Sequence, residues 1–210
     1  MKKYISIFTL GMMTLATAAF AGTTATNSNT VSPTLQISAT IQKAVQLTLS
    51  TGTAAVTHCT VTPTGGTPDY TMNFGTVDAL GINAGNCNKF NPANPGVDNA
   101  IYWSDYNLTP VFTSHTATSG TTISAKVTTD FGAPNNIFIV RDSANSSTVP
   151  AGAGSFTAVS TGTPDVIVGP GVTSGTAQTR FIGVAVKPDN GPTVLQGAQS
   201  ATVTFTLTVQ

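Results

Sequence analysis

The chain ends in Ala201-Thr-Val-Thr-Phe-Thr-Leu-Thr-Val-Gln210, where apolar and polar residues alternate without a break. Strict alternation with a period of two residues predicts a half-buried β-strand. One face would carry the threonines, and the other would carry Val203, Phe205, Leu207 and Val209. We expect this strand to pair either with an earlier segment of the chain or with another chain.

The first 21 residues have the pattern of a secretory signal peptide. Lys2 and Lys3 precede an apolar stretch over residues 5–15, and Ala19-Phe20-Ala21 forms an A-x-A cleavage site. No later stretch approaches the ~18 consecutive apolar residues of a membrane-spanning helix, so we expect no membrane anchor. The segment predicts export through the periplasm to the cell surface or into an extracellular fibre.

Charge is scarce in the expected mature chain, residues 22–210. Six basic residues stand against eight Asp and no Glu, which gives a net charge of 6 − 8 = −2. Without a basic patch we expect no nucleic-acid partner. Threonine makes up about a fifth of the chain, and Thr with Val favours pleated sheets whereas Gly, Pro and Asn favour turns.

About ten short strands with turn signals between them predict an all-β fold, an immunoglobulin-like antiparallel sandwich. We expect a flexible N-terminal arm over residues 22–34 and a single domain over residues 35–210. The expected strands after the first are 57–62, 70–77, 101–106, 108–113, 121–129, 137–141, 156–159, 165–168, 179–186 and the terminal strand.

Residues 35–49 alternate over an unusual length, with Lys43 as the exception among the odd positions. Fifteen residues would span roughly 50 Å, whereas ordinary strands are about 17–20 Å long. The run is therefore either two strands with a break near Lys43, or one long strand shared between two bodies. A third interpretation is that it is the domain's own first strand with a bulge; any donor would then lie in residues 22–34, which offer only Ala25 and Val31 as apolar contacts.

Two cysteines, Cys59 and Cys87, lie 28 residues apart. In an oxidising compartment an isolated pair predicts a disulfide, which would stabilise the fold by roughly 3–4 kcal/mol through loop-closure entropy. Free thiols are the alternative. His58 beside Cys59 raises the question of zinc, but C-x-x-C spacing is absent and we expect no metal site.

No other group of residues has a pattern that strongly predicts catalysis or ligand binding. We find no G-x-S-x-G elbow for a Ser-His-Asp triad and expect neither an enzyme nor a cofactor. The oxygen-rich loop over residues 78–99 lacks a calcium-binding frame and is expected to form turns. Three aromatic residues offer a sugar-stacking surface, although core packing is the preferred interpretation; they are Tyr102, Trp103 and Tyr106.

The run Asn73-Phe74-Gly75-Thr76-Val77-Asp78, after an early Cys-bearing strand, resembles the spore coat protein U family. That family includes the pilin subunits of archaic chaperone–usher pili. The signal peptide, the alternating first strand, the second cysteine and the alternating terminal strand occur in the same order as in that family.

The resemblance implies a sandwich that lacks one strand, completed by a periplasmic chaperone and later by the N-terminal extension of the next subunit. The partners would be copies of the chain in a filament, a chaperone and an outer-membrane usher. Val203, Phe205, Leu207 and Val209 would line the acceptor groove, and the donor residues would be Leu35, Ile37, Ala39 and Ile41. The alternative is a secreted, self-contained adhesin or carbohydrate-binding module.

Overall fold

The computed structural model describes residues 36–40, 44–113, 120–133, 135–188 and 197–209. The chain divides into two units, Met1–Thr40 and Ile41–Gln210. The expected signal peptide, the arm over residues 22–34 and a domain start at Leu35 lie outside the described residues. Within the described residues, no helix has the length and apolar character needed to cross a membrane.

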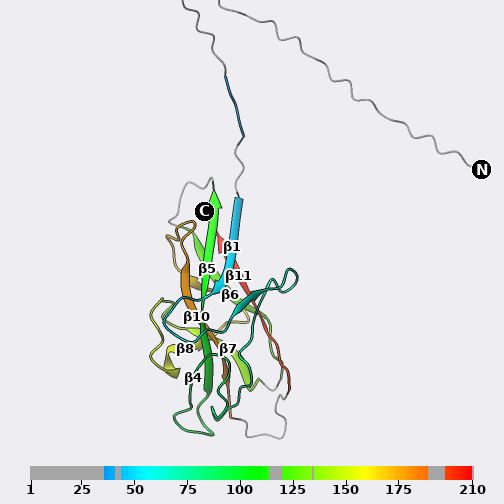
Figure 1. Cartoon of the computed structure of the whole chain (residues 1–210), viewed down its shortest axis with the longest axis vertical. Coiled ribbons are helices and arrows are strands. Elements are labelled where there is room, and N and C mark those ends of the chain that lie inside the picture. Colours follow the sequence, from blue (N-terminus) through cyan, green and yellow to red (C-terminus); the bar gives the residue numbers. More distant parts are fainter. Residues whose placement is uncertain (1–35, 41–43, 114–119, 134, 189–196, 210) are drawn as a thin grey trace, which may run out of the picture. The chain divides into compact units, whose positions relative to one another are not determined.

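The second unit is all-β, and its antiparallel sheets pack as a sandwich, which confirms the predicted fold class (Figure 1). The larger sheet has the order β1-β5-β10-β7-β8, with β4 also paired to β5, and the smaller sheet has the order β11-β6-β9. The larger sheet contains β1 (Ala44–Thr51), β4 (Asn88–Phe90), β5 (Ala100–Thr113), β7 (Ile137–Asp142), β8 (Phe156–Ala158) and β10 (Gln178–Val186). The remaining strands are β6 (Thr122–Thr129), β9 (Asp165–Val168), β11 (Thr202–Thr208) and the hairpin of β2 (Val61–Pro63) and β3 (Tyr70–Met72).

Strand β5 is a single strand of 14 residues, where the sequence predicted two shorter ones. It pairs with β10 along one edge and with β1 and then β4 along the other, and most of its residues are buried. Period-two alternation is lost because both faces of β5 are covered. Tyr102, Tyr106 and Leu108 face the core between the sheets, whereas Ile101 and Trp103 belong to a second apolar cluster.

The terminal alternation is confirmed, since β11 covers seven residues of it and pairs antiparallel with β6. Val203, Phe205 and Leu207 pack against the core, and the intervening threonines are exposed. Within the described residues β11 thus finds its partner in its own chain, but on one side only.

The long alternating run is divided in the structure. Strand β1 begins at Ala44, and residues 36–40 belong to no strand and are all exposed. Leu35, Ile41 and Lys43 lie outside the described residues. The expected strands over residues 57–62 and 70–77 are shorter than predicted, because only β2 and β3 pair there.

The buried position of Leu108 gives a test of the β5 assignment. Leu108 is fully buried in the core, so Leu108→Ala should lower the free energy of unfolding by about 2–5 kcal/mol. Val111, on the same strand but 39% exposed, is the matched control, and Val111→Ala should cost less than about 1 kcal/mol. Urea unfolding measures both, and equal losses would contradict the placement of β5 at the centre of the sheet.

Candidate functional site

A groove opens between β1 and β11, which are the edge strands of the two sheets on the same side of the sandwich. Among the described residues β1 pairs only with β5, and β11 pairs only with β6. The groove encloses a cavity of about 400 Å³. Most of its apolar lining comes from β1, β2, β3, β5, β7, β10 and β11 and from the segment after β3: Leu47, Leu49, Val61, Tyr70, Met72, Phe74, Tyr106, Ile139, Ile182, Val203 and Phe205.

Core side chains of both sheets form the bottom of this groove. The rings of Tyr106 and Phe205 lie 5.5 Å apart and connect β5 to β11. Burial raises the pKa of the Tyr106 hydroxyl well above its usual value, so the group stays protonated at all physiological pH values. The bottom of the groove is therefore uncharged and apolar.

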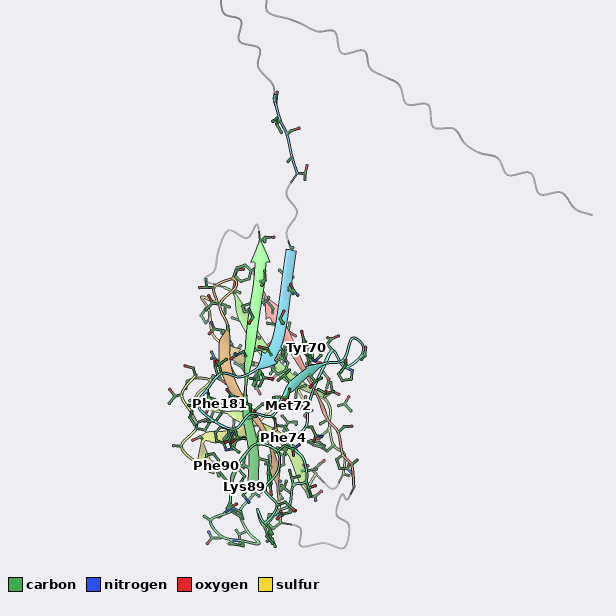
Figure 2. The ribbon with its side chains drawn as sticks, in the orientation of Figure 1. Tyr70, Met72, Phe74, Lys89, Phe90 and Phe181 are labelled. Carbon is green, nitrogen blue, oxygen red and sulfur yellow. A yellow bond between two sulfur atoms is a disulfide. The ribbon has the colours of Figure 1, made fainter. Side chains whose placement is uncertain are left out.

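The β2–β3 hairpin borders the groove with Tyr70 and Met72, and Phe74 follows from the next segment (Figure 2). All three side chains are half-buried and pack against the core between the sheets. The turn of the hairpin is closed by a bond from Thr64 N to Asp69 O at 2.9 Å. These residues form a third wall of the groove, a role that the sequence did not predict for them.

The other side of the sandwich is closed by hydrogen bonds. The segment between β8 and β9 contacts both sheets, since Val159 N donates to Ile139 O at 3.0 Å and Val127 N donates to Ser160 O at 2.9 Å. Arg141 of β7 also lies 3.5 Å from the carboxylate of Asp165 in β9. The two sides therefore differ: backbone bonds connect the sheets at β8 and β9, whereas β1 and β11 meet through apolar side chains.

The predicted acceptor residues are only partly in the groove. Val203 and Phe205 line it, Leu207 packs against the core without lining the cavity, and Val209 follows the end of β11. Leu47 and Leu49 of the facing wall are further lining residues, and the alternating pattern of residues 44–49 is the signal that would have identified them.

Of the predicted donor residues, the structure describes two. Ile37 is 84% exposed, and Ala39 is exposed as well. An aliphatic side chain with so little contact is available to a partner. The donor role of Leu35, Ile37, Ala39 and Ile41 stays a prediction.

The Phe-Gly-Thr-x-Asp motif anchors the loop that carries Cys87. Phe74 O accepts a hydrogen bond from Asn86 N at 2.9 Å. Gly75 has a φ of +75° and lies so close to the Asn86 side chain that a Cβ would collide with it. The adjoining disulfide between Cys59 and Cys87 is present, with Cα atoms 5.2 Å apart, as predicted.

Asp78 organises the next part of this loop. Its carboxylate accepts hydrogen bonds from three backbone N–H groups, those of Leu80 at 2.8 Å, Ile82 at 3.1 Å and Asn83 at 2.6 Å, and Tyr102 Oη lies 3.2 Å away. Burial alone would raise the pKa of Asp78, but these donors outweigh it and the pKa lies below its usual value. Both oxygens thus face N–H donors, as expected of a turn rather than a calcium loop.

His58 pairs with a buried carboxylate. Its Nδ1 lies 2.6 Å from Oδ1 of Asp105, which is fully buried, and Ala54 N donates to the other oxygen at 2.8 Å. Gly52 must lack a side chain because a Cβ would overlap Asp105. The pair fixes the segment after β1 against β5, a role that the sequence did not predict.

Within the described residues, the side chains considered for metal binding and for a catalytic triad have other partners. The sulfur atoms of Cys59 and Cys87 are joined to each other, so they are not free to bind zinc beside His58. No group of three or more His, Cys, Asp or Glu side chains with metal-binding geometry occurs within the described ranges. No described hydroxyl bonds to the second ring nitrogen of His58, as a Ser-His-Asp triad would require.

The three aromatic residues considered for sugar stacking are buried. Tyr102, Trp103 and Tyr106 are between 1% and 4% exposed, so their faces are not accessible to a sugar ring. Trp103 does not occupy the core between the sheets; it packs on the opposite face of the larger sheet, against Phe90 and Phe181.

Comparisons with protein-family models, curated proteins and solved structures find no match to this chain. The geometry of the groove is thus the main ground for a functional proposal.

The bonds to Asp78 predict a pH-dependent stability. Because the folded-state pKa is lowered, the stabilisation is present above the ordinary value of 3.8 and is lost as the pH falls through the folded-state pKa. Since Asp78 is only half-buried and water screens its carboxylate, Asp78→Asn should cost only about 1 kcal/mol near neutral pH. Urea unfolding at about pH 6 and about pH 2.5 should show that the cost shrinks at the lower pH.

Asp130→Asn is the control for this measurement, because Asp130 is exposed and accepts one bond from the adjacent Phe131 N. A cost of Asp78→Asn that is the same at both pH values would contradict the role of the ionised carboxylate.

Proposed function

We propose that the chain is a pilin-like structural subunit of a bacterial cell-surface fibre, assembled by donor-strand exchange. The domain would be an immunoglobulin-like sandwich that lacks one strand. The observation that carries the proposal is the apolar groove between β1 and β11, two strands that each have one unpaired edge within the described residues.

The physical argument concerns the backbone of the two edges. An edge strand presents N–H and C=O groups that pair readily with an added strand. A strand inserted between β1 and β11 would gain main-chain hydrogen bonds, and its alternate side chains would enter the cavity. The half-buried side chains of Leu47, Leu49 and Phe205 would then lose their remaining contact with water.

The segment over residues 35–41 has the properties that such a strand needs. Leu35, Ile37, Ala39 and Ile41 alternate with polar residues, which suits insertion of one face into an apolar groove. Seven residues in a strand span about 23 Å, the same as the seven residues of β11. The exposure of Ile37 is consistent with donation to another copy of the chain.

The resemblance to the spore coat protein U family implies a route of assembly. A secretory signal would bring the subunit to the periplasm, where the Cys59–Cys87 disulfide is stable. An open groove in the free subunit is prone to aggregation. By the same resemblance, a periplasmic chaperone would cover the groove and an outer-membrane usher would receive the complex. Copies of the chain would then replace the chaperone strand in the filament.

A charge placed on the donor face tests the proposal. Ile37→Arg should abolish the SDS-resistant ladder of the assembled fibre, because a guanidinium group cannot enter the apolar groove without a large desolvation cost. Gln36→Arg is the matched control, since the adjacent side chain would point away from the groove and the ladder should persist. Electron microscopy of the two variants provides a second measurement.

Both substitutions lie at exposed residues outside the sandwich, so the domain should fold in either variant. An unchanged ladder in Ile37→Arg would exclude Ile37 from the donor strand. A wild-type chain that is secreted as a stable monomer without a chaperone would overturn the fibre proposal and favour the self-contained adhesin.

A further inference from the structure

The larger sheet has a second apolar face that the groove does not use. On the side away from the smaller sheet, Ile101, Trp103, Val140, Phe181 and Ala185 form a buried cluster. Phe90, Phe138 and Phe156 pack against it and are only half-buried. The rings of Phe90 and Trp103 stack at 5.4 Å, and Phe181 packs edge-on against Trp103 at 5.8 Å.

The segments that cover this face leave a hollow between them. A cavity of about 640 Å³ lies between residues 90–99 on one side and residues 152–158 on the other. Its bottom is formed by buried side chains of three neighbouring strands, Ile101 of β5, Ala185 of β10 and Val140 of β7. The volume lies within the ~300–1,000 Å³ range of small-molecule sites.

Aromatic rings and polar side chains meet in this cavity. Phe90, Phe138 and Phe156 contribute ring surface, and Asp98 and Asn99 contribute polar groups. One oxygen of Asp98 accepts from Asn94 N at 2.9 Å and from Asn94 Nδ2 at 3.1 Å, which orients the carboxylate. Within the described part of the chain, the side-chain amide of Asn99 has no hydrogen-bond partner.

These groups select one class of ligand. A purely apolar molecule would cover the Asn99 amide and the second oxygen of Asp98 without giving either a partner, which is costly. The described lining residues include no Lys or Arg, and the amine of Lys187 lies over the Phe138 ring, 5.0 Å from its centroid. A phosphate or other anion would therefore meet the carboxylate of Asp98 without a lining cation to balance the charge. A pyranose ring has apolar C–H faces that pack on phenyl rings and hydroxyls that bond to carboxylate and amide groups.

We propose that this cavity is a binding site for a saccharide unit, with the ring packed on Phe90 and Phe156 and its hydroxyls bonded to Asp98 and Asn99. The site lies on the face of the larger sheet opposite the groove, so saccharide binding does not depend on strand exchange. It uses aromatic residues other than the three that the sequence suggested for this role.

The intrinsic fluorescence of Trp103 offers a direct measurement. Trp103 is the only tryptophan of the chain and contacts both Phe90 and Phe156. The secreted full-length protein, as isolated, is titrated with glucose, galactose, mannose and N-acetylglucosamine. It is also titrated with one disaccharide that contains each of these sugars. We expect at least one of these sugars to change the fluorescence saturably, with a Kd in the range of about 0.1–10 mM.

A pair of adjacent substitutions on β8 separates site binding from surface effects. Ala158 lines the cavity and is exposed, so Ala158→Phe should fill the site and weaken binding by about tenfold or more. Thr157→Phe adds the same ring on the other face of the strand and should leave the affinity unchanged. Asn99→Ala should weaken binding by about tenfold through one lost hydrogen bond.

The opposite results would overturn the proposal. The first is that no sugar binds at concentrations up to about 20 mM. The second is that the Ala158→Phe and Thr157→Phe variants bind sugar with equal affinity. The third is that an apolar dye binds at this site and no sugar does. Loss of the ladder in Ile37→Arg with sugar binding retained would show that the two sites act independently.

Discussion

The central position of β5 in the larger sheet determines most of the arrangement. Its backbone is paired on both edges, with β1 and with β10, and both of its faces are covered by apolar side chains. Tyr106 extends from one face to the groove, and Trp103 extends from the other to the outer cluster. The same strand therefore supports both candidate sites, and Asp105 holds the segment after β1 in place through His58.

The two edges of the sandwich differ in how their backbone groups are satisfied. At β8 and β9 the connecting segment bonds to both sheets, so strand addition would have to displace existing hydrogen bonds. At β1 and β11 apolar side chains are already in contact around an open cavity, and added main-chain bonds would compete only with water. Because of this asymmetry, we place the proposed strand addition at β1 and β11.

The outer face of the larger sheet is a separate feature with a different chemistry. Long loops, one anchored by Asp78 and by the Cys59–Cys87 disulfide, cover that face and leave a cavity with aromatic and polar walls. A fibre built from such subunits would present this cavity once in every repeat. Multiple weak sites along a filament can hold a surface far more firmly than one site does.

The alternating residues of the terminal segment determined β11 and its buried face, because a period of two leaves a strand only one way to bury Val203, Phe205 and Leu207. The two cysteines likewise predicted their own disulfide. The continuity of β5 was not predictable, since a strand buried on both faces loses its alternation.

Only the tertiary structure decided that Leu47, Tyr70 and Phe205 share one groove and that Phe90 and Phe156 share another cavity, because these residues are distant in sequence. Their proximity depends on strand order and loop packing. Local periodicity fixes which face a side chain occupies, but it does not specify the neighbour that the face meets.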